Sequence, residues 1–149
     1  MRHFLAALFI LVAAEGAALA CSCVPPTRDA EQRREAVRSL RAGAVALVEV
    51  ELIAPYRGDG RGEQMRVRRT LAGRAPAIFR IERDGPPSSA GCDIEFDQGG
   101  AGLILLYPAR QPINARDPVY RISSLCAAIL LGNPTIRATL IREWGRRSD

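Results

Sequence analysis

Five segments in the middle of the chain show the hydrophobic pattern of β-strands. In the first of them, apolar side chains alternate with Glu49 and Glu51, which is typical of a strand with one buried face. A later segment, Gly102–Tyr107, is apolar throughout and fits a fully buried strand. The predicted strands are Ala44–Ile53, Gln64–Leu71, Ala77–Glu82, Gly102–Tyr107 and Val119–Ser124.

A helix is predicted before the first strand, over Thr27–Ala42, and Gly43 ends it. Thr27 is the expected N-cap, because its hydroxyl can accept hydrogen bonds from backbone N–H groups of the first turn. Acidic side chains precede basic ones, an order that complements the helix dipole. They are Asp29 and Glu31 in the first turn, followed by Arg33, Arg34, Arg38 and Arg41.

A second helix is predicted near the C-terminal end, where Asn133 is the expected cap and Pro134 the first helical residue. Its apolar stripe consists of Ile136, Leu140, Ile141 and Trp144, and Trp144 is expected in the core. Five short strands with flanking helices predict a mainly β fold. We expect a five-stranded barrel like the oligonucleotide/oligosaccharide-binding (OB) fold, with a helix before the first strand and a C-terminal helix.

The first twenty residues have the pattern of an export signal. Arg2 and His3 give a positive start, Leu5–Ala14 is apolar, and Ala18–Ala20 is a small-x-small cleavage site. The apolar run is shorter than the roughly 20 residues that a membrane-spanning helix needs, so no transmembrane anchor is expected. Cleavage would leave residues 21–149 as one secreted or periplasmic domain.

The chain has four cysteines, all in the predicted mature part: Cys21, Cys23, Cys92 and Cys126. An even number in an exported chain predicts two disulfides, although the count alone leaves three pairings open. The alternative is that some of these cysteines are reduced and buried.

The histidine content and the net charge of the chain exclude several classes of function. The only histidine, His3, leaves with the signal peptide, so the mature chain has no Ser-His-Asp or Cys-His catalytic site. A zinc site of its own would require unpaired cysteines. Arginine supplies all the positive side chains behind the net charge of +5, which in an exported chain supports weak attraction to anionic surfaces and no nucleic-acid partner. We expect no enzyme, cofactor or resident metal.

The residues after the cleavage site carry a resemblance to a known family. A chain that begins Cys21-Ser22-Cys23 directly after its signal peptide resembles the tissue inhibitors of metalloproteinases and the wider netrin-like family. The later features follow in a similar order. They are the strand after Gly43, a second strand that ends Thr70-Leu71-Ala72-Gly73, Cys92, the apolar strand Leu103–Tyr107, and Cys126.

The resemblance implies the disulfides Cys21–Cys92 and Cys23–Cys126. The family's additional disulfide and cysteine-rich C-terminal domain are missing, so this chain would be a minimal, single-domain member. We expect a monomer. In the inhibitors, the amine and carbonyl of the first cysteine chelate the protease's catalytic zinc, a role that here falls to Cys21. The protease-contact residues would then be Ser22, Cys23, Val24, Pro25, Gly91 and Cys92.

Two alternatives remain open for the N-terminal cysteine. Netrin-like modules without inhibitory function have the same framework, so the chain could instead be a binding or structural module with another envelope protein as partner. A lipoprotein anchored at Cys21 is disfavoured, because Ala18 stands where lipoprotein signals usually have leucine. Lipidation would also leave an odd number of thiols.

Three further motifs are interpreted as structural. Asp93-x-Glu95-x-Asp97 resembles the start of a calcium loop, but Gln98 and Ile104 replace its glycine and its bidentate glutamate, so we expect the wet face of a strand. Arg57-Gly58-Asp59 matches an adhesion tripeptide by chance in a loop that could extend a contact surface. The basic stretch of Arg66, Arg68, Arg69 and Arg74 is expected to be a solvated strand face rather than an anion site.

Overall fold

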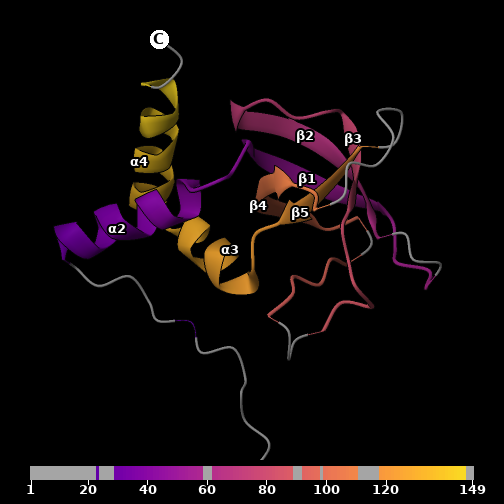
Figure 1. Cartoon of the computed structure of the whole chain (residues 1–149). Helices are drawn as coiled ribbons and strands as arrows, with labels where there is room; N and C mark the ends of the chain where they lie inside the picture. The colour runs from indigo at the N-terminus through magenta and orange to yellow at the C-terminus, as the bar shows by residue number, and fades with distance from the viewer. Residues whose placement is uncertain are drawn as a thin grey trace, which may run out of the picture.

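Five strands and three helices make up the described part of the chain (Figure 1). The structure, a computed structural model, describes Cys23 and residues 29–58, 62–88, 92–97, 99–110 and 118–146. The strands are β1 (Ala46–Ala54), β2 (Gln64–Gly73), β3 (Ile78–Ile81), β4 (Ala101–Pro108) and β5 (Val119–Ile122). The helices are α2 (Ala30–Arg41), α3 (Leu125–Gly132) and α4 (Pro134–Gly145).

The strands close into a barrel in the order β1-β2-β3-β5-β4. β1 pairs antiparallel with both β2 and β4, while β3 and β5 run parallel to each other. This confirms the predicted OB-fold-like barrel with a helix before the first strand and a C-terminal helix, which is α4; α3 is an additional helix.

β1 has core on both of its faces. Val48, Val50 and Leu52 point into the barrel, where they pack with Phe79 and Met65. On the opposite face Glu49 and Glu51 are half-buried, as the alternating pattern predicts. Leu47 shares that outer face but is fully buried, because the helices cover this end of the strand.

The three helices lie on one side of the barrel (Figure 1) and enclose a second hydrophobic core. Its buried members are Val37, Leu40, Ala44, Leu47, Leu105, Leu131, Ile136, Leu140 and Trp144. Asn133 ends α3 and also caps α4, since its side chain accepts hydrogen bonds from the N–H groups of Thr135 and Ile136. The predicted cap, the proline at the first helical position and the core role of Trp144 are confirmed.

Three local predictions are wrong. α2 is capped by Asp29, whose carboxylate accepts from the N–H of Glu31; Thr27, the expected cap, lies outside the described residues. The last strand ends at Ile122 instead of Ser124, because Ser124 caps α3, a helix that the sequence patterns did not predict. Residues 93–97 alternate in burial but form no strand, since they pair with no neighbouring strand and the first two, Asp93 and Ile94, bind the side chain of Arg83 instead.

The strand that ends in the glycine turn, β2, closes tightly against the start of β1. Gly73 has a φ of +76°, a backbone conformation that favours glycine. A Cβ atom at this position would lie 2.1 Å from the carbonyl oxygen of Val45. The predicted closing turn therefore requires glycine both for its dihedral angle and for its space.

Candidate functional site

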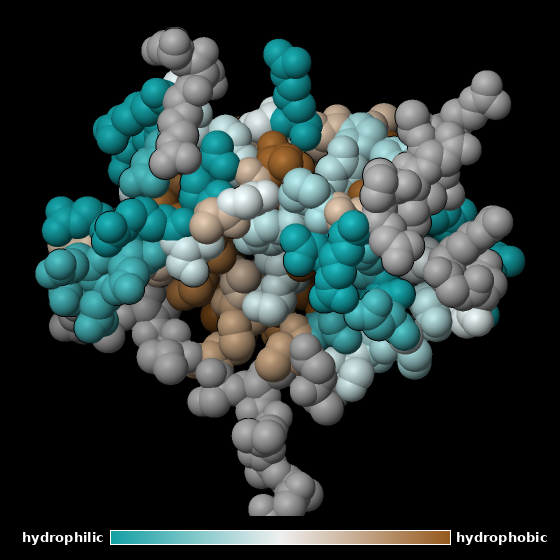
Figure 2. Space-filling view, viewed as in Figure 1, coloured by the Kyte–Doolittle hydropathy of each residue, from teal (hydrophilic) through white to brown (hydrophobic). Residues whose placement is uncertain are grey.

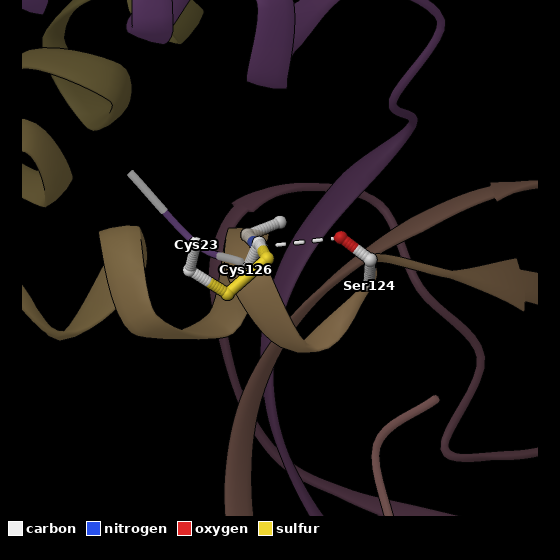
Figure 3. The surroundings of a disulfide bond; sticks show 4 residues. Cys23, Ser124 and Cys126 are labelled. Atoms are coloured by element: carbon white, nitrogen blue, oxygen red, sulfur yellow. Dashed lines mark hydrogen bonds between the residues drawn. A yellow bond between two sulfur atoms is a disulfide. The ribbon is translucent and has the colours of Figure 1, made fainter. Parts of the chain in front are cut away.

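A disulfide joins the start of the described chain to α3. Cys23 is bonded to Cys126 across 103 positions of sequence, with their Cα atoms 5.1 Å apart (Figure 3). This confirms one of the two pairings that the family resemblance implies. Cys126 lies in the first turn of α3, so the bond fixes Cys23 beside the N-terminal end of this helix.

Local hydrogen bonds give that helix end a defined structure. The hydroxyl of Ser124 accepts from the N–H of Ala127, as the dashed line in Figure 3 marks, and its carbonyl accepts from Ala128. The N–H of Leu125 donates to the carbonyl oxygen of Cys92 at 2.9 Å. Leu125 immediately precedes Cys126. The segment that contains Cys92 and the disulfide-bonded Cys23 therefore both meet the start of α3.

Cys92 itself has a φ of +58°, in the left-handed region that non-glycine residues seldom adopt. It is disulfide-bonded. Cys21, the partner that the resemblance implies, lies outside the described residues. The same holds for four predicted contact residues: Ser22, Val24, Pro25 and Gly91. Of the predicted site, the structure therefore describes Cys23, Cys92 and Cys126, and it brings all three to the start of α3.

A buried arginine ties the Cys92 segment to the barrel. Arg83 makes a bidentate ion pair with Glu63 at 2.9 Å, and only 5% and 4% of these two side chains is exposed. The same guanidinium binds the carboxylate of Asp93 at 2.9 Å and the carbonyl of Ile94 at 2.9 Å. Charge-assisted bonds of this kind are stronger than neutral ones, so Arg83 holds the segment after Cys92 at two points, Asp93 and Ile94.

Sequence patterns did not identify Arg83 or Glu63, because nothing along the chain links two residues that meet only after folding. Asp93 was considered as part of a calcium motif, but its carboxylate binds Arg83 and accepts from the N–H of Ser88. Within the part of the chain that the structure describes, no group of three or more His, Cys, Asp or Glu side chains could hold a metal ion.

A polar cavity of about 590 Å³ opens beside this junction. Tyr107 lines it, and the hydroxyl of Tyr107 donates to the carbonyl of Leu40 at 3.0 Å. Burial raises the pKa of Tyr107 above its ordinary value. Charges around the cavity are matched, since Arg110 binds Asp84 and Arg121 approaches Glu82. The cavity is lined by residues of α2, β4, β5, α3 and the segment after β3, namely Ser39, Leu40, Glu82–Pro86, Asp93, Tyr107, Arg110, Arg121–Ser124 and Ala127.

The remaining motifs have structural explanations where they are described. Arg66 and Arg68 both approach the carboxylate of Glu51, at 3.9 and 2.8 Å, which supports the solvated strand face. Asp59 of the adhesion-like tripeptide lies outside the described residues. Among the described helices, none has both the length and the apolar character needed to cross a membrane.

Comparison with known proteins adds no family assignment to this geometry. No protein-family model, no curated protein and no solved structure matches the chain.

Proposed function

We propose that the protein is an exported domain that inhibits a zinc metalloprotease through the N-terminal amine and carbonyl of Cys21. The observation that carries the proposal is the convergence of Cys23, Cys92 and Cys126 at the start of α3. A chain extends at most about 3.6 Å per residue, so Cys21 is tethered within about 7 Å of Cys23 and hence close to this helix end.

The fixed positions of Cys23 and of the Cys92 segment support inhibition through the N-terminal Cys21. Cys23 is fixed covalently, and the Cys92 segment is fixed by Leu125 and by the buried Arg83. A binding element that is already ordered loses less conformational entropy when it meets its target. Cys23 and the Cys92 segment would therefore lose little conformational freedom on binding a protease, which supports the proposal.

The chemistry of chelation requires a free amine. An α-amino group has a pKa of about 7.7–8.0, so a useful fraction is neutral near pH 7.5 and can donate its lone pair to zinc. The carbonyl oxygen of the same residue completes a five-membered ring with the metal. Catalytic zinc keeps one coordination position open for water, and this pair of atoms would occupy it.

The experiment compares three forms of the mature protein against thermolysin and the catalytic domain of a matrix metalloprotease. One form begins at Cys21, one carries an additional alanine before Cys21, and the matched control carries an additional alanine after Asp149. We expect the first and third forms to inhibit and the second to lose inhibition, because the extension removes the free amine from Cys21. Thermal unfolding of each form checks that the fold is intact.

Three results would overturn the proposal. Inhibition that survives the N-terminal alanine excludes chelation by Cys21. A native N-terminus that inhibits neither protease favours the non-inhibitory binding or structural module, for which the same disulfide and ion pairs serve stability alone. A diacylglycerol adduct on Cys21, detected by mass spectrometry of the protein purified from its host, shows that the chain is a lipoprotein.

A further inference from the structure

The outer face of β1 and β2 carries three arginine side chains, Arg66, Arg68 and Arg69, which we call the β2 arginine face. Arg66 faces Glu51 across the two strands. Arg69 faces Glu49 in the same way, and the side chains of such partners lie on the same side of an antiparallel pair. Arg68 binds the carboxylate of Glu51 at 2.8 Å, so it lies on this side as well.

A β-bulge brings Arg69 to this face. Strict alternation along β2 would place Arg69 on the side opposite the two other arginines. One step along β1, from Glu49 to Val50, corresponds to two steps along β2. Arg68 is the extra residue, because the partners on β2 are Arg69 and Val67. A bulge of this kind redirects the side chains beside it, so that three guanidinium groups share one side of the strand.

Guanidinium groups form the outermost layer of this face. The side chains of Arg66 and Arg68 are 56% and 54% exposed, whereas that of Glu51 is only 18% exposed. Arg69 is also exposed, and Glu49 is half-buried. The residues that pair with Arg66 on β3 and with the two glutamates on β4 are uncharged, namely Ile78, Leu103 and Ala101. The face therefore presents more positive than negative charge to the solvent.

An exposed apolar side chain lies beside these cations. Ile78 is the partner of Arg66 and is 42% exposed. Cations next to an apolar side chain suit the boundary between lipid headgroups and acyl chains, where the cations meet phosphates and the apolar group leaves water. A soluble polyanion such as an acidic polysaccharide would gain nothing from Ile78. Figure 2 shows hydrophilic atoms, in teal, that project from the upper edge of the molecule above the place where Figure 1 draws β2.

We propose that the β2 arginine face and Ile78 bind the surface of a membrane rich in acidic phospholipids. The face is open and solvated, and guanidinium groups form strong hydrogen bonds with phosphate oxygens. Each arginine near an anionic surface strengthens binding about fivefold. The net charge of +5 adds a longer-range attraction. The contact does not depend on chelation by Cys21, and it would hold an exported domain at the membrane surface.

Co-sedimentation with vesicles tests this contact. The form that begins at Cys21 is titrated with vesicles of phosphatidylglycerol and phosphatidylcholine, and separately with phosphatidylcholine alone, at about 0.1 M salt. We expect binding to the acidic vesicles only, and Arg66→Gln/Arg68→Gln should weaken it at least about tenfold. Arg69→Gln, which leaves the ion pairs of Glu51 intact, should weaken it about fivefold. Ile78→Ser should weaken it at least about threefold, because the apolar contact is lost.

The matched control is Arg110→Gln/Arg121→Gln. These two arginines are 64% and 45% exposed and lie next to carboxylates, as Arg66 and Arg68 do. Arg121 is on β5, which β3 separates from β2 and β4 separates from β1, and the N–H of Arg110 binds the same Glu82 that Arg121 approaches. The control removes the same charge on the other side of the barrel, so it should weaken binding less than about threefold.

Four outcomes would overturn the membrane contact. They are a lack of binding to the acidic vesicles, equal binding to phosphatidylcholine alone, equal weakening by the two double variants, and an unchanged affinity of Ile78→Ser. Equal weakening would mean that net charge alone drives binding, whereas an unchanged Ile78→Ser would identify the ligand as a soluble polyanion, for which heparin is the probe. Thermal unfolding of each variant checks that the fold is intact.

Discussion

The guanidinium carbon of Arg41 lies 3.8 Å from the centre of the Trp144 ring, so that the last turn of α2 stacks on the last turn of α4. One guanidinium nitrogen of Arg41 also donates to the carbonyl of Ala44 at 2.8 Å. A single side chain thus connects two helices to the segment that enters β1. Trp144 is 8% exposed. The cation–π interaction is stronger above a ring that is shielded from water than above a fully hydrated ring.

Replacing this arginine should therefore destabilise the domain. We expect Arg41→Met, which keeps an apolar stem, to lower the free energy of unfolding by about 1–2 kcal/mol through loss of the cation–π contact and the hydrogen bond. Urea unfolding measures the change. Arg38→Met is the matched control, because Arg38 is an exposed arginine in the same last turn of α2, and it should change stability by less than about 0.5 kcal/mol. Equal effects of the two changes would contradict a specific role for the Arg41–Trp144 contact.

The Cys23–Cys126 disulfide should be a major source of stability. The double variant Cys23→Ser/Cys126→Ser is expected to lose about 2–5 kcal/mol, because an open chain has more conformational freedom when unfolded. The bond spans 103 positions, which places the expected loss toward the upper end of that range. Urea unfolding of the variant and the unmodified protein measures the loss, and similar unfolding midpoints would show that the bond only positions the N-terminal segment.

The ion pair between Arg83 and Glu63 should matter far more than an exposed one. Arg83→Met would leave the Glu63 carboxylate, which is only 4% exposed, without this ion-pair partner. We expect the free energy of unfolding to fall by about 3–5 kcal/mol. Arg110→Met is the matched control, because Arg110 and Asp84 form a pair whose side chains are 64% and 87% exposed. This second change should cost less than about 1 kcal/mol. Chemical denaturation compares the two, and comparable losses would indicate that burial does not set the strength of these pairs.

The strand pattern was predictable because one face of each strand contacts the barrel core. The alternation of Phe79 and Ile81 with Ile78 and Arg80 in β3 is an example: the first two are buried, while Ile78 is exposed. Likewise the cap at Asn133 was predictable, since a short polar side chain before a proline satisfies N–H groups within its own turn. These features depend on neighbours in sequence.

The features that were missed either join residues distant in sequence or lack the alternation of polar and apolar positions that reveals an element. The helix α3 has no polar side, so its sequence lacks the period that reveals a helix; the N-cap Ser124 was its only local signal. The buried pair of Arg83 with Glu63 joins residues 20 positions apart. As for the candidate site, the bond from Cys23 to Cys126 followed from family resemblance, whereas the hydrogen bond from Leu125 to Cys92 required the folded structure.

Two glycines with the same backbone conformation separate dihedral strain from steric exclusion. Gly58 and Gly73 both have a φ of +76°, but a Cβ atom on Gly58 meets nothing within 4 Å, whereas one on Gly73 approaches the carbonyl oxygen of Val45 to 2.1 Å. Gly58→Ala should cost about 1–2 kcal/mol, the penalty of a side chain in the left-handed region. Gly73→Ala should cost clearly more, because β1 and β2 must also move apart. Thermal unfolding of both variants checks the order, and equal losses would exclude the steric contribution.

Acid should weaken the outer face of β1 and β2 through Glu51. The hydrogen bond from Arg68, at 2.8 Å, holds the pKa of the Glu51 carboxyl below its ordinary value of 4.5, and the charges of Arg68 and Arg66 act in the same direction. Because the folded pKa is the lower one, this stabilisation is fully present above pH 4.5 and is lost as the pH falls through the folded pKa. The difference in urea midpoint between the unmodified protein and Glu51→Gln should therefore shrink from about pH 7 to about pH 3. In an Arg68→Gln background the same comparison should vary much less with pH, and an unchanged pH dependence there would assign the effect to a group other than the Glu51–Arg68 pair.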